Sequence, residues 1–223
     1  MLKGMRILVT QADVFMGPAL CKALSAQGAT VLADVRDLTP VDAPAQMIQA
    51  HGQVDVLLAN LAVPAPVTLA AEVSEDEWLA VFNSMVHPLQ RMVKAVLPQM
   101  QARGRGKVVV MGSASALRGM KRSSSYSAAR GAQLAYVQAV GVEMAAFNIQ
   151  VNAIAQNFVD NPTYFPAEMQ ANPKFQERLK REVPLGRLVK AEEDAAFAAY
   201  LCSSQADCFV GQVFPMSGGW ATR

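Results

Sequence analysis

The stretch KVVVMGSASALRGMKRSSSYSAARGAQLAYVQAVGVEMAAF (Lys107–Phe147) contains the unit from which the fold is built. It begins with a short apolar run, Lys107 to Met111, whose valines suit a strand buried on both faces. It continues into a longer stretch, Ser124 to Phe147, in which apolar residues have the spacing of a helix. A buried strand followed by a covering helix is the repeating pair of a parallel α/β sheet.

The same alternation extends through the rest of the chain. We expect strands at about Arg6 to Thr10, Thr30 to Asp34, Val54 to Ala59, Lys107 to Met111, Gln150 to Ala155 and Val213 to Met216. Helices are expected at about Gly17 to Gln27, Ala43 to Gln49, Glu75 to Arg103, Ser124 to Phe147, Pro173 to Arg181 and Ala191 to Ser203. This order predicts an α/β fold with a doubly wound, Rossmann-like parallel sheet of six or seven strands and helices on both faces. About twenty residues separate the second strand from the third, so an additional edge strand is expected to be missing or vestigial.

Composition limits both the domain count and the kind of partner. With 223 residues, 52% of them hydrophobic, and no repeat or long linker, the chain is expected to form a single domain over residues 1–223. The net charge of +2 comes from 20 basic and 18 acidic residues spread along the sequence, which argues against binding to nucleic acid or an anionic membrane. A small uncharged or singly charged substrate fits better. The start has no signal-like apolar run, and no stretch approaches about 18 uninterrupted apolar residues, so we expect a cytoplasmic protein.

Neither the cysteines nor the histidines have the spacing of a metal site. Cys21, Cys202 and Cys208 are odd in number and unpaired in spacing, which favours three reduced, buried thiols. His51, next to a glycine in an expected turn, and His87 within a helix show no ligand spacing either. We therefore expect no metal.

Candidate catalytic residues follow the strand in the opening stretch. Ser113 and Ser115 stand at its end, where ligands of a doubly wound sheet bind. Tyr126 and Arg130 are four residues apart, which places them on one face of a helix. A guanidinium near a phenol favours the ionised form, which can act as a base. Taken alone, the pair could equally be an ordinary contact on a helix surface.

A strand-end serine thirteen residues before a Tyr-x-x-x-basic motif resembles the catalytic region of the short-chain dehydrogenase/reductase superfamily. In that superfamily the basic residue is a lysine that touches both the tyrosine and the nicotinamide ribose. The version with arginine, Ser113-Tyr126-Arg130, resembles the halohydrin dehalogenases, which work without a nicotinamide. The thirteen-residue interval favours Ser113 over Ser115 as the catalytic serine.

The turn after the first strand carries a second part of the resemblance. It reads Thr10-Gln11-Ala12-Asp13-Val14-Phe15-Met16-Gly17, and only its last glycine remains of those that a dinucleotide binder uses for close approach to the pyrophosphate. The arrangement of threonine, four residues, aromatic, one residue and glycine is similar to that of the dehalogenase family. Phe15 is expected to project into the space that a cofactor would use, so no cofactor is expected.

The segment after the fifth strand is the expected halide pocket. Gln156 and Asn157 stand where a dehydrogenase of this type has Pro-Gly. Backbone donors and positive aromatic edges in this region suit a leaving halide better than a fixed cationic side chain, which would hold the ion too tightly. The residues expected to bind halide and substrate are Phe15, Gln156, Asn157, Phe158, Val159, Tyr164 and Phe165. The last five lie in Asn157 to Lys174, the longest irregular stretch.

The resemblance implies conversion of a vicinal haloalcohol to an epoxide with release of halide and a proton. Ser113 would donate a hydrogen bond to the substrate hydroxyl oxygen, and Tyr126, kept anionic by Arg130, would take its proton. The alkoxide would then displace halide from the neighbouring carbon. In reverse, a small anion such as azide, cyanide or nitrite would open an epoxide.

Two other functions remain open, together with the state of assembly. Asp34 ends the second strand where an NAD enzyme holds a ribose hydroxyl, which favours an atypical NAD(P)-dependent reductase. A non-catalytic, dehydrogenase-like sensor is the third possibility. The long helices carry more apolar positions than one sheet face should need, including Val81, Met85, Met92, Leu134, Val137 and Met144. We therefore expect a homotetramer, as in related scaffolds.

Overall fold

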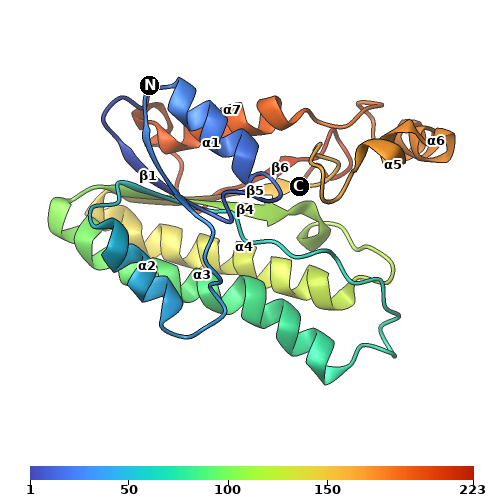
Figure 1. Ribbon diagram of the computed structural model, residues 1–223, viewed down its shortest axis with the longest axis horizontal. Coiled ribbons are helices and arrows are strands. Elements are labelled where there is room, and N and C mark those ends of the chain that lie inside the picture. Colours follow the sequence, from blue (N-terminus) through green and yellow to red (C-terminus); the bar gives the residue numbers. More distant parts are fainter.

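The computed structural model describes residues 1–223 and contains one parallel sheet of six strands, in the order β2-β1-β3-β4-β5-β6 (Figure 1). The strands are β1 (Arg6–Thr10), β2 (Thr30–Asp34), β3 (Val56–Ala59), β4 (Gly106–Ser113), β5 (Ile149–Gln156) and β6 (Val213–Met216). The helices are α1 (Gly17–Ala26), α2 (Ala43–His51), α3 (Glu75–Arg103), α4 (Ser124–Met144), α5 (Ala167–Ala171), α6 (Pro173–Glu182) and α7 (Ala191–Cys202). The expected doubly wound α/β fold is confirmed, and α2 alone connects β2 to β3, without an additional edge strand.

Helices cover both faces of the sheet. In Figure 1, α2, α3 and α4 lie on one face and α1 and α7 on the other, while α5 and α6 project from one end. Each face has its own apolar core, because successive residues along each strand point to opposite faces of the sheet. In β1, for example, Leu8 packs with the α2–α4 layer, and Ile7 and Val9 pack with α1 and α7.

The two central strands are longer than the sequence indicated. Every residue of β4 is buried, and all but the last of β5, and their parallel register aligns Ser113 with Gln156 at the carboxyl ends. This pairing continues the hydrogen bonds of the sheet past the apolar run from which strand length was predicted. It brings the end of β4 next to the segment expected to bind halide.

The apolar residues assigned to subunit contacts have a different role. Val81, Met85, Met92, Leu134, Val137 and Met144 are each at most 5% exposed within the single chain, so they belong to its own interior. The expectation of a homotetramer loses this support, because α3 and α4 pack on each other as well as on the sheet.

Three smaller expectations need correction. Cys202 is buried, but Cys21 is half-buried and Cys208 is exposed, although all three are free thiols. His51 is the last residue of α2 rather than part of a turn. The stretch from 157 to 174 is not wholly irregular, because it contains the short helix α5. No helix is long and apolar enough to cross a membrane.

Candidate active site

The carboxyl ends of β1, β4 and β5 open into a cavity of about 420 Å³ lined by 24 residues. All ten residues selected from the sequence line it: Phe15, Ser113, Tyr126, Arg130, Gln156, Asn157, Phe158, Val159, Tyr164 and Phe165. The parallel strands explain this convergence, because their carboxyl ends meet at one edge of the sheet.

Arg130 is held rigidly beneath Tyr126. Its Cζ atom lies 5.0 Å from the centroid of the Tyr126 ring, within the range of a cation–π contact. Its Nη1 atom donates to Leu61 O at 2.8 Å, Met111 O at 3.0 Å and Gln133 Oε1 at 2.9 Å. The residue is 2% exposed. Burial disfavours its charge, but the Tyr126 and Tyr164 hydroxyls nearby raise the pKa of Arg130, so the guanidinium remains a permanent cation.

Tyr164 is the partner of Tyr126, a role that the sequence did not reveal. The two phenolic oxygens are 3.1 Å apart, and the Tyr164 hydroxyl donates to Val63 O at 2.6 Å. Tyr164 has one hydroxyl hydrogen, so Tyr126 must be the donor to Tyr164 in this arrangement. Burial, reinforced by Tyr126, raises the pKa of Tyr164, so Tyr164 stays neutral.

The two candidate serines differ in their access to the cavity. Their Oγ atoms are 3.0 Å apart, and Ser115 N donates to Ser113 Oγ at 3.2 Å. Ser113 lines the cavity, whereas Ser115, 3% exposed, does not. Ser115 is therefore placed to orient the hydroxyl of Ser113.

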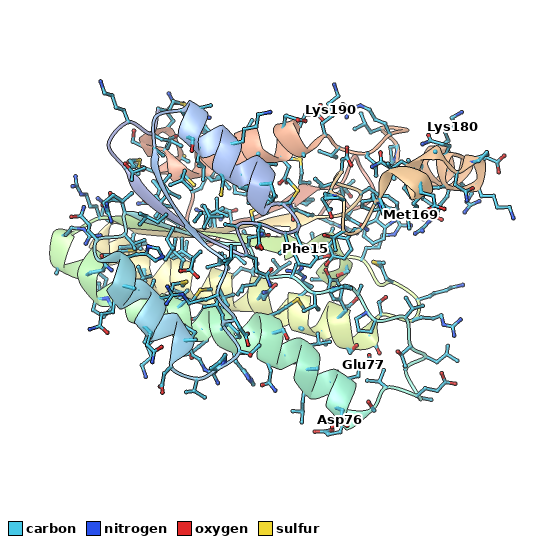
Figure 2. The ribbon with its side chains drawn as sticks, in the orientation of Figure 1. Phe15, Asp76, Glu77, Met169, Lys180 and Lys190 are labelled. Atoms are coloured by element: carbon cyan, nitrogen blue, oxygen red, sulfur yellow. The ribbon has the colours of Figure 1, made fainter.

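Phe15 occupies the turn after β1 with a backbone φ of 52°, in the left-handed region that a phenylalanine rarely adopts. Its ring centroid lies 5.3 Å from that of Tyr164. Figure 2 labels Phe15 near the middle of the molecule, where the residue is half-buried. The turn is closed tightly, because a Cβ atom on Gly17 would overlap Gln11 O.

Amide side chains bind this turn to the segment after β3. Asn60 Nδ2 donates to Gln11 O at 3.0 Å and to Val14 O at 3.2 Å. The side chain of Gln11 accepts from Ala62 N at 2.9 Å and donates to Ala62 O at 3.1 Å. With these groups engaged and Phe15 in the cavity, the turn does not fit a dinucleotide pyrophosphate.

Asp34, which favoured a reductase, is also engaged within the chain. Its carboxylate accepts from Arg36 Nε at 2.9 Å and lies 2.9 Å from His51 Nε2. Burial opposes its ionisation, but the hydrogen bonds from Arg36 and His51 hold the pKa of Asp34 below its usual value. This agrees with a structural role rather than with a ribose site.

The segment after β5 differs from the expected row of free backbone donors. Asn157 N donates to Met216 O at 3.1 Å, and Phe158 N donates to Asn157 Oδ1 at 2.9 Å. The Asn157 Nδ2 atom is buried without a partner and is an available donor. Gln156, which also lines the cavity, donates from Nε2 to Asp194 Oδ2 at 2.6 Å.

An aromatic wall closes the other side of the cavity. The Phe158 ring centroid lies 5.9 Å from Phe165 and 6.2 Å from Trp220. At the mouth, Arg178 Cζ lies 5.5 Å from the Phe158 ring centroid, and its Nε atom is 3.1 Å from Glu182 Oε2. Arg178 therefore lines the same cavity as the residues expected to hold the halide by backbone donors and aromatic edges. No motif marks Arg178, which is exposed on the amphipathic helix α6.

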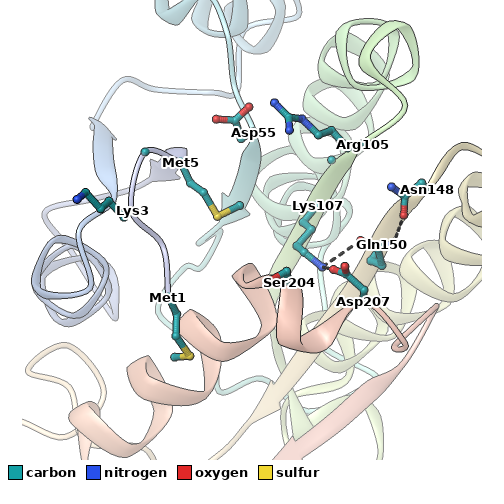
Figure 3. A pocket seen from close by; sticks show the side chains of 12 residues that line it. Met1, Lys3, Met5, Asp55, Arg105, Lys107, Asn148, Gln150, Ser204 and Asp207 are labelled. Carbon is teal, nitrogen blue, oxygen red and sulfur yellow. Dashed lines mark hydrogen bonds and ion pairs between the residues drawn. The ribbon is translucent and has the colours of Figure 1, made fainter.

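A second cavity, of about 390 Å³, lies at the opposite end of the sheet (Figure 3). Lys107, at the start of β4, donates from Nζ to Gln150 Oε1 at 3.0 Å and to Asp207 Oδ1 at 2.6 Å. The charge of this lysine is thus already paired within the chain.

Comparisons with known proteins agree with the fold and the motif. A family model described as Enoyl-(Acyl carrier protein) reductase matches residues 2–221. The 3-oxoacyl-(acyl-carrier-protein) reductase FabG of Pseudomonas aeruginosa is 32% identical over 199 residues, 89% of this chain and 78% of that protein. Dehydrogenase/reductase SDR family member 4 of Oryctolagus cuniculus is 28% identical over 205 residues, 90% of this chain and 78% of that protein.

Solved structures are similar over almost the whole chain. One called "Dehalogenation enzyme" is 33% identical with a TM-score of 0.92, covering 99% of this chain and 100% of the other. A gluconate 5-dehydrogenase from Burkholderia cenocepacia, in complex with NADP and tartrate, has a TM-score of 0.88, covering 98% and 96% of the two chains, and at 22% identity shows only the fold. Together with the serine–tyrosine motif, these matches establish that the chain belongs to the short-chain dehydrogenase/reductase superfamily.

Proposed function

We propose that this protein is a halohydrin dehalogenase, which converts vicinal haloalcohols to epoxides without a nicotinamide cofactor and catalyses the reverse opening of epoxides by small anions. The observation that carries the proposal is that Ser113, Tyr126 and Arg130 share one cavity with Phe15, whose ring packs on Tyr164. The base and its cation are retained, while the turn that would bind a dinucleotide is filled by protein. The 33% identical structure called "Dehalogenation enzyme" adds support.

The first step is proton transfer. Ser113 Oγ–H donates to the substrate hydroxyl oxygen, and the Tyr126 phenolate takes the hydroxyl proton. The buried guanidinium of Arg130, 5.0 Å from the ring centroid, favours the phenolate because it supplies a full positive charge in a site of low dielectric. Tyr164, neutral and next to Tyr126, can turn its hydroxyl from Val63 O to the phenolate oxygen and donate to it.

The second step is intramolecular displacement. The alkoxide oxygen forms a bond to the adjacent carbon as the carbon–halogen bond breaks, and the electron pair of that bond leaves with the halide. The unpartnered Asn157 Nδ2 and the edges of the aromatic wall support a role for this region in receiving the ion. Tyr126 then releases its proton to solvent, so the products are epoxide, halide and a proton.

Arg178 gives the halide an exit. It is exposed at the mouth and shares its charge with Glu182, so it attracts an anion to the opening without forming a buried ion pair with it.

The decisive experiment measures halide release from 1,3-dichloro-2-propanol or its bromo analogue with no nicotinamide present. The wild-type protein is expected to release halide, and Tyr126→Phe is expected to lose about 10²-fold to 10⁴-fold in kcat/KM, because the base is removed. Folding of the variant is checked by circular dichroism. Absence of release from the wild type, together with saturable binding of NADH or NADPH, would contradict the proposal.

That last outcome would favour an atypical reductase. The relatives 32% and 28% identical to this chain are named a reductase and a dehydrogenase/reductase. Absence of both halide release and nucleotide binding would instead favour the non-catalytic sensor. A homotetramer remains a prediction, and light scattering of the purified protein tests it.

A further inference from the structure

One buried carboxyl group beside the cavity has no part in the proposed reaction. Asp194, in the first turn of α7, is 0% exposed and does not itself line the cavity. Its Oδ2 atom accepts from Gln156 Nε2 at 2.6 Å, and its Oδ1 atom is buried with no hydrogen-bond partner. A carboxyl group in this position is costly unless it is neutral or fully hydrogen-bonded, so its presence needs an explanation.

Gln156 connects this carboxyl group to the cavity. Its amide has two chemically different ends, an Nε2 that donates and an Oε1 that accepts. With Nε2 bonded to Asp194, no protein group donates to Oε1, and the side chain lines the cavity beside Asn157. If the Oε1 end is the one turned toward the cavity in this state, the pocket presents a carbonyl oxygen, which repels an anion. If Asp194 were protonated, its hydroxyl could donate to Oε1, and the amide would turn its N–H groups toward the cavity.

We propose that the protonation of Asp194 determines which end of the Gln156 amide faces the pocket, and that this controls the affinity of the pocket for halide. Asp194 is thus a positioning residue that acts through Gln156, and the inference rests on the proposed function. Protonated Asp194 gives a donor-lined pocket that binds halide. Ionised Asp194 gives an acceptor-lined pocket with a negative charge behind it, which releases halide.

Asp194 changes its charge near neutral pH, where this change can control halide binding. Burial raises the pKa of Asp194 to about 7, although the hydrogen bond from Gln156 lowers it. The carboxyl group is therefore neutral below about pH 7 and charged above it. Halide affinity is expected to be high below this value and to fall as the pH rises through it.

Charged groups on the neighbouring elements do not explain this behaviour. The ionisable side chains on α7 and the elements packed against it are Cys21 and Lys22 on α1, Lys107 at the far end of β4, and Glu192, Glu193, Tyr200 and Cys202 on α7. Lys22 is exposed, Lys107 is paired with Asp207, and Glu193 is paired with Arg187. β5 and β6 carry no ionisable side chain. Only burial and the Gln156 hydrogen bond shift the pKa of Asp194.

The test is bromide binding followed by quenching of tryptophan fluorescence between pH 5.5 and 8.5. Trp220 reports on the pocket because its ring contacts Phe158, and Trp78, which lies on the exposed side of α3, is replaced by phenylalanine in every sample. In this background the bromide Kd is expected to rise at least about fivefold with pH, a typical size for coupling between two sites. Asp194→Asn, which cannot ionise, is expected to bind bromide with a Kd that does not change with pH.

Two control variants separate Asp194 from other groups that titrate. Tyr126→Phe and His51→Gln are expected to keep the pH dependence. The first removes the base and its hydrogen bond to Tyr164 but leaves Asp194 and Gln156 in place, and the second removes a group that lies at Asp34. A second measurement needs no change at Asp194: since binding favours protonated Asp194, bromide added near pH 7 is expected to cause proton uptake, which an indicator dye detects. The measurement is made in Tyr126→Phe, so that the phenol does not contribute.

The outcomes distinguish this inference from the proposed function. Bromide binding that is independent of pH, or a pH dependence that persists unchanged in Asp194→Asn, would overturn the role of Asp194 and leave the dehalogenase proposal standing. Absence of bromide binding at every pH would overturn the halide pocket and the role of Asp194 together. Release of halide from haloalcohol, measured separately, decides the proposed function in either case.

Discussion

The two ends of the sheet hold cavities of similar size, about 390 Å³ and about 420 Å³, but their polar groups are organised in opposite ways. At the amino end, Lys107 is satisfied by Gln150 and Asp207, and Asp55 accepts from the backbone of Arg6 at 2.9 Å. Lys107 and Asp55 are thus engaged by partners within the chain.

The carboxyl end combines backbone strain with unpaired polar atoms. Phe15 and Phe158 have φ angles of 52° and 51°, which cost energy for a side chain of this size. Arg130 Nε, Asn157 Nδ2 and Asp194 Oδ1 are buried without hydrogen-bond partners. Such features persist where they serve a function. The amino-end cavity has one non-glycine residue of this kind, Asn148 with a φ of 56°, and asparagine adopts this region more readily than phenylalanine. Volume alone therefore does not identify the site.

The sharpest test of this contrast is Ser113→Ala against Ser115→Ala. Ser113 lines the cavity, so its removal is expected to lower kcat for halide release about 10²-fold to 10³-fold, as for loss of one catalytic hydrogen-bond donor. Ser115→Ala is expected to retain most of the activity, because Ser115 acts only on Ser113. Steady-state kinetics on both variants measures this, and the reverse order of effects would assign catalysis to Ser115.

A smaller effect is expected from Arg130→Lys. A lysine keeps the positive charge but cannot reproduce the planar group over the Tyr126 ring, so kcat/KM is expected to fall about tenfold. An unchanged kcat/KM would mean that Arg130 serves only to hold Leu61 O and Met111 O.

The smallest effect is expected at the amino end. Lys107→Met removes the ion pair with Asp207, which is 54% exposed and can be solvated by water once the lysine is gone. The free energy of unfolding is expected to change by less than about 1 kcal/mol, measured with urea, and halide release should be unchanged. A loss of activity in this variant would mean that the two ends are coupled.

The sequence predicted the fold and the convergence of the site because both follow from patterns along the chain. Strand ends are close in any parallel sheet, and a Tyr-x-x-x-Arg spacing determines a helix face, so the residues after β1, β4 and β5 could be selected in advance. The extension of β4 to Ser113 could not be predicted from the sequence, because it depends on pairing with Gln156 in another strand.

Contacts between distant residues account for the other differences. The bond from Gln156 to Asp194 and the hydroxyl contact between Tyr126 and Tyr164 each join residues 38 positions apart, and neither has a periodic signal. The apolar positions of α3 and α4 were assigned to subunit contacts because hydropathy shows that a residue is buried but not by what. The structure shows that these helices bury them within the chain.

The hydrogen bonds that the amide side chains of Gln11 and Asn60 form between the two loops have a consequence for redesign. Replacing Phe15 with glycine would empty space in the turn but leave these four hydrogen bonds, and the backbone they hold, in place. A nucleotide could enter only if the two loops separated, so restoring its site requires changes in both loops at once. Any single substitution toward a nucleotide site would lower the stability of the fold before it allowed a nucleotide to bind. A nucleotide site is therefore difficult to restore by one substitution at a time.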